Sequence, residues 1–343
     1  MNGAKYRPIL EEYMIETAKD IRLGHFEKMF NNISTFMEFI IVGFPGTIGF
    51  QYIFFFLLLI TYLLTLLCNF LIMIITSTEK CLFTPMYFYI RNLSFLEVCY
   101  VSVIVPKVLD TITIHGRFIS FFGCISQLFF FFFLSSTECF LFGIMAYDRY
   151  LAICHPLHYT TLMNSDKCRC LTIGSIIGGF ITTFPHIVLI SQLPFCRSNV
   201  INHFFCDSPP LLQLACADTY LIDLLDFSCA SLVILTSMLV TLLSYFHIIA
   251  TIIVIRSKQG RSRAFSTCGT HLIVVSIYYG AVIFMYVKPK VTFSFALNRV
   301  VAVFYTIITP ILNPIIYCLR NKSVKESLRK RLQFINYQLF RSH

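Results

Sequence analysis

Long apolar runs recur along the chain and constrain its fold more than any other feature. Seven of them reach roughly 20 residues or more, the length that a helix needs to cross the hydrocarbon core of a bilayer. They cover 51–76, 85–109, 121–148, 171–190, 221–254, 264–287 and 295–319. The second and seventh are the least regular, because they contain Glu97, Lys107, Arg299 and Asn313. The pattern predicts an all-α membrane protein with a seven-transmembrane-helix bundle over residues 51–319.

Composition supports this class of protein. Hydrophobic residues make up 57% of the 343 residues and charged residues only 13%, whereas a soluble domain is closer to half apolar and a quarter charged. The net charge is +10, but the basic residues gather in short stretches between the apolar runs. That distribution indicates the orientation of loops rather than a partner such as nucleic acid. The N-terminal stretch carries scattered charges and no signal-peptide core, so the first run is expected to direct insertion.

Basic residues concentrate in alternate loops. They follow the first, third, fifth and seventh runs: Lys80; Arg149, Lys167 and Arg169; Arg256, Lys258, Arg261 and Arg263; Arg320, Lys322, Lys325, Arg329, Lys330 and Arg331. The opposite side is richer in acids, with Asp110, Asp207, Asp218, Asp223 and Asp226. The positive-inside bias therefore predicts an extracellular segment 1–50 and a cytoplasmic tail 320–343.

Two features on the predicted outer side fit this orientation. Asn32 belongs to an Asn-Ile-Ser sequon that the topology places outside the cell, so glycosylation is expected there. Four cysteines fall on the same side, where disulfides persist: Cys124, Cys196, Cys206 and Cys216. Four cysteines allow three pairings, and their spacing does not choose among them.

An ionisable residue inside a spanning helix is costly and indicates function. Glu138 and Arg149 are 11 residues apart in the third run, which places them on one helix face about 16 Å apart. Ser135 and Phe131 continue this face outward. The alternative interpretation is a polar seam that only holds helices together.

Polar residues also lie near the middle of other runs. Asn69, Glu97 and Asn313 share this depth with Glu138 and are expected to form one network, with water or a cation as a conceivable further member. Pro314 follows Asn313 and permits a kink. Such a network has two arrangements available to it, as a switch requires.

Other classes of function have less support. A transporter could have the same features, but it would be expected to show internal repeats, and none is convincing at half-length. The sequence has no nucleotide-binding glycine loop, no zincin motif and no Ser/His/Asp arrangement. We therefore expect no enzymatic activity, no catalytic residue, no metal site and no cofactor.

Several motifs resemble one known family. "MAYDRYLAICHPLHY" (145–159) resembles a rhodopsin-like G-protein-coupled receptor, and specifically an odorant (olfactory) receptor. Four further stretches resemble motifs of the same family and occur in the same order: "TPMYFYIRNLSFLEVCY" (84–100), "SYFHII" (244–249), "RAFSTCGTHL" (263–272) and "PILNPIIYCLRNKSVKESL" (310–328). The resemblance covers 29–335. Residues 1–28 have no place in the family pattern and are expected to be a disordered N-terminal extension.

The resemblance implies a plasma-membrane receptor that binds small volatile molecules within the bundle and activates a stimulatory olfactory-type G protein, raising cyclic AMP. A rhodopsin-like receptor for a non-odorant small molecule in a non-olfactory tissue is the alternative within this fold. Basic residues along 320–331 suit anionic lipid headgroups and an acidic partner surface. There Val324, Leu328, Leu332 and Ile335 recur at helical spacing, which predicts a short amphipathic C-terminal helix on the bilayer.

The resemblance also implies roles for individual residues. Asp148 would hold Arg149 at rest and release it on activation, and the set of switch residues would include Tyr150, Tyr245, Asn313, Pro314 and Tyr317. Asn69, Glu97 and Glu138 would belong to the central polar network. Two disulfides are implied, Cys124 with Cys206 and Cys196 with Cys216.

A ligand site follows from family position. Its expected residues are Phe131, Phe132, Ser135, Ser136, Asp207, Ser208, Asp226, Cys229, Val233, Tyr279, Val282, Tyr286 and Thr306. Because these walls are largely apolar, alcohols, aldehydes, ketones or esters are expected rather than strongly charged amines.

Overall fold

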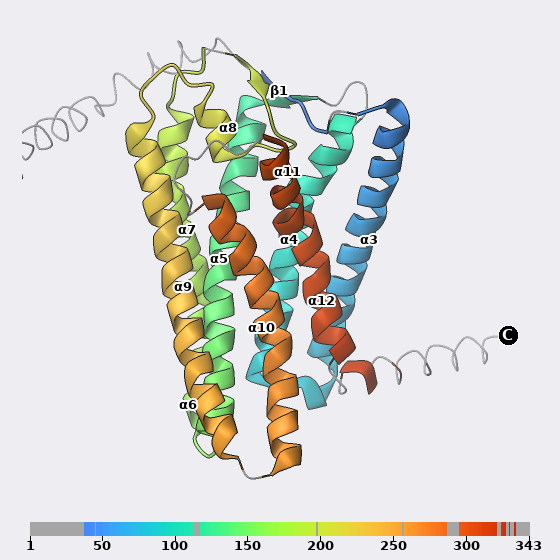
Figure 1. Ribbon diagram of the computed structural model, residues 1–343, viewed down its shortest axis with the longest axis vertical. Helices are drawn as coiled ribbons and strands as arrows, with labels where there is room; N and C mark the ends of the chain where they lie inside the picture. The colour runs from blue at the N-terminus through green and yellow to red at the C-terminus, as the bar shows by residue number, and fades with distance from the viewer. Residues whose placement is uncertain are drawn as a thin grey trace, which may run out of the picture.

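The computed structural model describes residues 38–44, 46–112, 117–196, 198–255, 257–286, 295–320, 324–326, 329 and 333 (Figure 1). Within these ranges, the side chains at 260, 262–267, 270, 285–286, 295–298 and 317–320 are not described. The predictions for residues 1–28 and for Asn32 lie outside the described residues.

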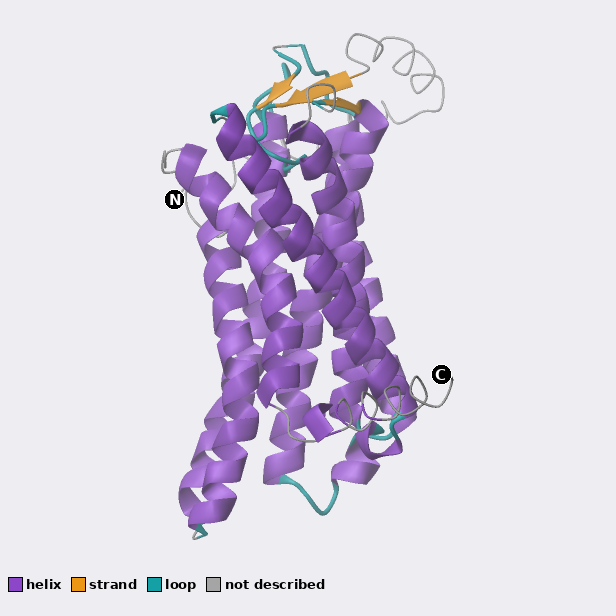
Figure 2. Cartoon of the chain, turned by 90° about the vertical axis from the view of Figure 1, so that its right-hand side faces the viewer, coloured by secondary structure: helices purple, strands orange, loops and turns teal. Residues whose placement is uncertain are grey.

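Long helices lie side by side and account for all seven predicted runs (Figures 1 and 2). They are α3 (Ile48–Thr78), α4 (Pro85–Ile112), α5 (Phe121–Cys154), α7 (Ser165–Ser191), α9 (Tyr220–Val254) and α10 (Lys258–Tyr286), followed by α11 (Phe295–Val303) and α12 (Thr309–Arg320). The π-helical turn η2 (Phe304–Ile308) joins α11 to α12. Short helices occupy the connections: η1 (Lys80–Leu82), α6 (Tyr159–Leu162) and α8 (Ser208–Leu212).

Length and composition alone mark 5 of the described helical segments as able to cross a membrane: α3, α5, α7, α9 and Arg299–Ile316. Two of the predicted spans, α4 and α10, do not meet this criterion. For α4 this agrees with the prediction, which named Glu97 and Lys107 as interruptions. The prediction also named the seventh run as irregular, but that run qualifies, whereas the apolar part of α10 is limited to His271–Phe284. Both still lie beside the apolar helices in one bundle (Figure 1).

Polar caps fix where several helices begin. The side chains of Thr47, Ser120 and Asn164 accept hydrogen bonds from the third backbone N–H that follows each of them, at the starts of α3, α5 and α7. Such caps satisfy N–H groups that have no partner within the helix. At α7 the cap starts the helix at Ser165, ahead of the apolar run that predicted a start at 171.

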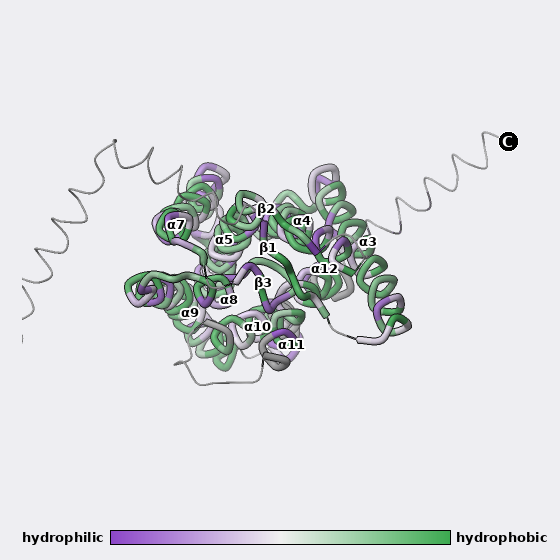
Figure 3. Tube along the Cα trace, turned by 90° about the horizontal axis from the view of Figure 1, so that it is seen from above, coloured by the Kyte–Doolittle hydropathy of each residue, from purple (hydrophilic) through white to green (hydrophobic). Residues whose placement is uncertain are grey.

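The helices differ in how deeply they are buried. In the most apolar part of α5, 56% of the residues are buried, compared with 28% in α3. Seen from above, α3 lies at the edge of the bundle while α5 lies among its neighbours (Figure 3). Large exposed apolar side chains on α3, α7 and α9, such as Phe56, Ile177 and Leu239, suit contact with lipid. The central helix is therefore α5, which carries the buried polar residues of the third predicted run.

A small β-sheet, which the sequence pattern did not predict, covers one end of the bundle (Figure 2). Its order is β2 (Phe118–Ser120), β1 (Glu38–Ile41), β3 (Val200–Ile201). β1 pairs antiparallel with β2, placing Phe39 opposite Ile119, and parallel with β3, placing Ile41 opposite Ile201. Phe39 and Ile41 are fully buried beneath it.

Two disulfides fasten the long outer loop at the same end. Cys124 at the start of α5 is joined to Cys206, with their Cα atoms 5.5 Å apart, and Cys196 is joined to Cys216 within the loop. The loop is thereby held over the mouth of the bundle.

The opposite end carries the start of the C-terminal segment. Val324 is buried against Ile75 and Leu82. The other apolar positions of the predicted amphipathic helix, Leu328, Leu332 and Ile335, lie outside the described residues.

Candidate ligand cavity and cytoplasmic switch

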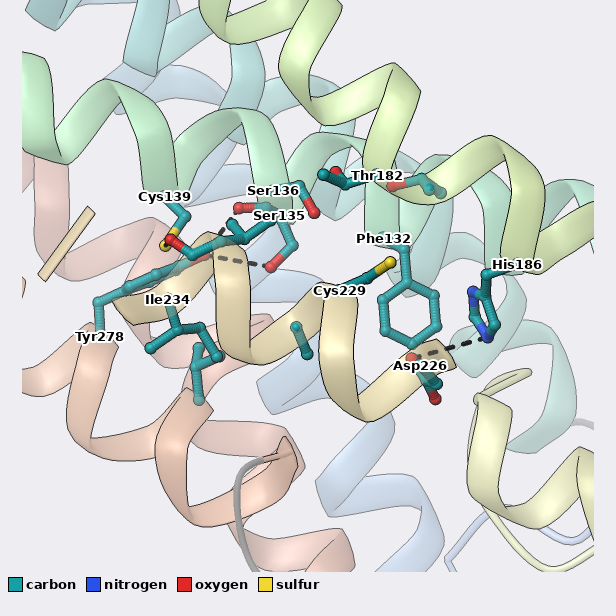
Figure 4. Close-up of a pocket in the computed structure, with 14 residues that line it drawn as sticks. Phe132, Ser135, Ser136, Cys139, Thr182, His186, Asp226, Cys229, Ile234 and Tyr278 are labelled. Atoms are coloured by element: carbon teal, nitrogen blue, oxygen red, sulfur yellow. Dashed lines mark hydrogen bonds and ion pairs between the residues drawn. The ribbon is translucent and has the colours of Figure 1, made fainter. Parts of the chain in front are cut away.

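A cavity lies in the outer half of the bundle, between α5, α7, α9 and α10 (Figure 4). The space between its lining atoms is about 500 Å³, part of it open to solvent. Its lining consists of Phe132, Ser135, Ser136, Cys139, Thr182, Thr183, His186, Asp226, Cys229, Ala230, Val233, Ile234, Tyr278 and Val282.

Over half of the predicted ligand residues line this cavity. They are Phe132, Ser135, Ser136, Asp226, Cys229, Val233 and Val282. The others lie elsewhere, apart from Tyr286, whose side chain is outside the described residues.

Phe131 is buried against Phe205 of the outer loop, with ring centroids 5.0 Å apart. Thr306 donates to the Ala302 carbonyl within its own helix. Asp207 caps α8 by accepting from the Ser208 N–H, and Ser208 contacts the cavity residue His186 at 3.4 Å. None of these four predicted residues is in the lining.

Two polar groups mark the ends of the cavity. At the outer end His186 Nε2 lies 3.6 Å from Asp226 Oδ1. At the inner end the Tyr278 hydroxyl donates to the Ser135 carbonyl at 2.9 Å and lies 3.1 Å from Ser135 Oγ. Figure 4 shows these pairs at opposite ends, with Phe132 and Cys229 between them.

Sequence reasoning missed half of the lining: Cys139, Thr182, Thr183, His186, Ala230, Ile234 and Tyr278. Of these, His186 carried a usable signal, because it is an ionisable residue inside a predicted span. The small and aliphatic residues carried none, since their types are those of any helix packed in a bundle.

A hydrogen-bonded junction lies just below the cavity. Ser237 of α9 donates to the Cys139 carbonyl of α5 and also hydrogen bonds to the Tyr279 hydroxyl of α10. The approach of α9 to α5 is close here: a Cβ atom at Gly143 would lie 3.1 Å from Ser237 Oγ. The predicted residue Tyr279 therefore ties three helices together at the cavity floor.

The central polar residues form a smaller network than predicted. Asn313 Nδ2 donates to Glu97 Oε1 and lies 3.5 Å from Glu138 Oε1, so it links α12 to α4 and α5. Asn69 is set apart from this trio. Its Nδ2 donates to the carbonyls of Thr65 at 3.0 Å and Pro310 at 3.4 Å, fastening α3 to the helical turn that precedes Pro314.

Asp148 and Arg149 lie near the cytoplasmic end of α5. Arg149 donates to Asp148 Oδ2 through Nη2 at 2.6 Å and through Nε at 3.2 Å. The Tyr159 hydroxyl of α6 donates to the other carboxylate oxygen at 2.7 Å. Burial and then the Asp148 charge raise the pKa of Tyr159, which keeps this phenol protonated and donating. The Asp148 carboxylate is fully buried and is held by both neighbours.

The predicted tyrosine partners lie nearby but bond to other groups. Tyr245 donates to the Cys268 carbonyl at 3.1 Å and hydrogen bonds to His271 Nδ1 at 2.9 Å, which joins α9 to α10. Tyr150 hydrogen bonds to His155 at 2.9 Å. The Tyr317 side chain is outside the described residues. Tyr245 is thus bonded to α10 rather than to Arg149.

Within the described ranges, no group of three or more His, Cys, Asp or Glu side chains could hold a metal ion.

Comparison with known proteins assigns the chain to a family. A family model described as "Olfactory receptor" matches residues 58–334. Human olfactory receptor 6B1 is 47% identical over 85% of this chain and 94% of its own length. Human olfactory receptor 6B2 is 46% identical over 88% and 96%, and rat olfactory receptor 287 is 48% identical over 88% and 97%. The chain belongs to the olfactory receptor family and is a seven-helix, multi-pass receptor of the plasma membrane, not an enzyme.

Proposed function

We propose that the cavity binds a small volatile molecule and that the occupied receptor activates a stimulatory olfactory-type G protein, raising cyclic AMP. The observation that carries this proposal is the course of α5. The helix contributes Phe132, Ser135, Ser136 and Cys139 to the cavity and Asp148 and Arg149 to the cytoplasmic end. Since a helix rises 1.5 Å per residue, Cys139 and Asp148 are about 14 Å apart along one stiff element.

Contacts of α5 supply a route between the two ends. The Ser237 junction lies at the cavity floor, and Asn313 bridges the buried acids one step further in. A ligand that alters the packing of α5 against α9 or α10 acts on both sets of contacts. We assign Asp148, Arg149, Tyr150, Tyr245, Asn313, Pro314 and Tyr317 to the switch on this basis, together with their family positions.

Release of Arg149 is the proposed output step. In the resting arrangement its guanidinium group is occupied by Asp148, whose second oxygen is occupied by Tyr159. A ligand shifts such an equilibrium only to the extent that it binds the active arrangement more tightly. Once released, Arg149 would face the G protein.

The test is cyclic AMP in cells that express the receptor together with an olfactory-type G protein and receive a panel of volatile compounds. We expect a response from the unaltered receptor and its loss in Arg149→Ala at equal surface level. Arg169→Ala is the matched control, because Arg169 is an exposed cytoplasmic arginine whose contact with Asp166, at 3.7 Å, contributes little. A response that survives Arg149→Ala unchanged would contradict the proposed output step.

A further inference from the structure

Several polar groups of the ligand cavity already have partners inside the protein. Tyr278 and Ser135 bond to each other at the inner end. Thr182 donates to the Gly178 carbonyl of its own helix at 2.9 Å. A group whose hydrogen bond is already made gains little from a ligand, because binding only exchanges one partner for another.

The pair at the outer end is different. His186 Nε2 lies 3.6 Å from Asp226 Oδ1 and 3.4 Å from Ser208 Oγ, and both separations exceed the usual 2.7–3.2 Å of a good hydrogen bond. The His186 side chain is only 3% exposed, and that of Asp226 only 17% exposed. Ser208 also hydrogen bonds to the Asp226 carboxylate. His186 and Asp226 have therefore left much of their contact with water, and only a long contact joins them to each other.

The position of the imidazole ring is fixed from two sides. The Phe132 ring lies edge-on to the His186 ring, with centroids 5.4 Å apart and planes at 86°, and Ser208 is fully buried beside it. The pair also joins two helices, since His186 belongs to α7 and Asp226 to α9. Together these contacts present one nitrogen and one carboxylate to the cavity (Figure 4).

We infer that this cavity selects ligands that carry a hydroxyl group, which donates its proton to the Asp226 carboxylate and accepts one from His186 Nε2–H. The inference rests on the proposed function of the cavity as the ligand site and narrows its ligand class to alcohols. A hydroxyl oxygen can lie about 2.8 Å from two atoms that are 3.6 Å apart, and it is both a donor and an acceptor.

Ligands without this pairing of roles fit less well. A ketone, aldehyde, ester or ether accepts from His186 but places only lone pairs against Asp226, which loses contact with water and gains no donor. A carboxylate is repelled by Asp226. A protonated amine pairs with Asp226, but its positive charge then faces the His186 Nε2–H donor and offers it no acceptor. The apolar part of the lining, including Val233, Ile234 and Val282, gives every class the same contact.

The first experiment compares compounds on one carbon skeleton. Straight-chain, cyclic and benzylic alcohols are each tested beside the matching methyl ether, ketone and primary amine, with cyclic AMP as the readout. We expect the alcohol to act at roughly one tenth of the concentration required by its ether or ketone, the factor set by one hydrogen bond to a charged group. Equal potency of alcohol and ether, or a preference for the amine, overturns the inference.

Variants then locate the source of that preference. In Asp226→Leu the ratio of the effective concentration of the ether to that of the alcohol should fall about tenfold, and in Asp226→Asn it should fall less, because the amide oxygen still accepts a hydrogen bond. His186→Leu should also lower the ratio. The ratio is measured within each variant, so a change in surface level does not mimic the effect.

Asp223→Asn is the matched control, since Asp223 lies one turn away on the same helix, outside the cavity lining, near Thr219. It should keep the full preference for alcohols. A ratio that stays unchanged in Asp226→Leu overturns the inference.

A second readout separates the ligand class from the signalling function. The same compounds are added to the purified receptor and its thermal unfolding is followed. Stabilisation by alcohols over ethers, without any cyclic AMP response, upholds the ligand class and counts against the proposed coupling. Absence of stabilisation by every alcohol, together with absence of a cyclic AMP response to them, overturns the ligand class.

Discussion

The two ends of the bundle each hold an aspartate, but the hydrogen bonds to the two carboxylates differ. Asp148, at the cytoplasmic end, receives bonds of 2.6 and 3.2 Å from Arg149 and one of 2.7 Å from Tyr159. Asp226, in the outer cavity, has a hydrogen bond with Ser208 and His186 at 3.6 Å. The first carboxylate is bonded by a cation and a phenol at short distances, whereas the second has a hydroxyl and a distant imidazole and can accept a further hydrogen bond.

This difference matches what each end must do. A buried charge with short bonds on both oxygens stabilises one arrangement strongly, and removing a partner leaves an uncompensated charge. A loosely paired charge stabilises its own arrangement weakly but lets a bound group complete the hydrogen bonds. We propose that the cytoplasmic end holds one arrangement and that the outer end is the part changed by a ligand.

The most direct test of this difference between Asp148 and Asp226 is to neutralise each carboxylate in turn. Asp148→Asn should lower the free energy of unfolding by about 3 kcal/mol or more, because Arg149 stays buried without its counter-charge. It should also raise cyclic AMP in the absence of ligand. Asp226→Asn should cost less than about 1 kcal/mol. Thermal unfolding in detergent and basal cyclic AMP measure the two effects, and equal losses in both variants would remove the distinction.

A second under-bonded group on the outer side gives a pH-dependent effect. His203, in the loop between β3 and α8, is 4% exposed, and neither ring nitrogen makes a hydrogen bond of normal geometry. Burial, and then the positive charge of Arg299, lower the pKa of His203 to about 3, against the opposite effect of the Phe205 carbonyl. The folded receptor therefore holds this imidazole neutral where an unfolded chain would protonate it.

The sign follows from that difference. Stability linked to neutral His203 is fully present above the unfolded pKa of about 6.5 and is lost as the pH falls toward 3. Between pH 6.5 and 5 the loss is about 2 kcal/mol at about 1.4 kcal/mol per pH unit. The measurement is thermal unfolding at both pH values, with His203→Gln as the variant that lacks this proton. An identical pH dependence in the two proteins would contradict the assignment.

Sequence alone predicted the helices well, because apolar length fixes where a chain can cross a membrane. Predicted and observed ends differ by at most about six residues, at the end of α5 and at the starts of α7 and α10. At α7, Lys167 and Arg169 hide the first turns that Asn164 caps. The β-sheet was not predictable in this way. β2 and β3 have only 3 and 2 residues, and their pairing with β1 depends on loops brought together by the fold.

The cavity was predictable only in part. Residues such as Phe132 and Asp226 were placed by family position, whereas His186 was passed over although it is ionisable and lies within a spanning run. Its importance comes from a partner on another helix, which spacing along one helix does not reveal. The same applies to Asn69, whose depth suggested a contact with Glu97 but whose amide instead meets the Pro310 carbonyl.

A smaller effect is expected from the third group at the cytoplasmic aspartate. Tyr159→Phe removes one hydrogen bond to Asp148 and leaves the bonds from Arg149 in place. The expected loss is about 1.5 kcal/mol, the low end for a bond to a charged group, with a rise in basal cyclic AMP below that of Asp148→Asn. Because the pKa of Tyr159 is raised, basal signalling should not change between neutral and mildly alkaline pH. A basal level in Tyr159→Phe as high as in Asp148→Asn would mean that the tyrosine, and not the arginine, holds the resting state.

The smallest effect is expected from a polar cavity residue that resembles Asp148 in having its bonds already made. Thr182 faces the cavity, but its hydroxyl lies 2.9 Å from the Gly178 carbonyl and 3.1 Å from the Gly179 carbonyl. Thr182→Val keeps the shape of the side chain and removes only a hydroxyl bonded to its own helix, so the potency of every ligand class should change less than about twofold. Dose–response curves for an alcohol and its ether measure this beside Asp226→Leu. A selective loss of alcohol potency in Thr182→Val would show that the polarity of the lining, rather than unused hydrogen-bonding capacity at Asp226, determines which ligand class the receptor prefers.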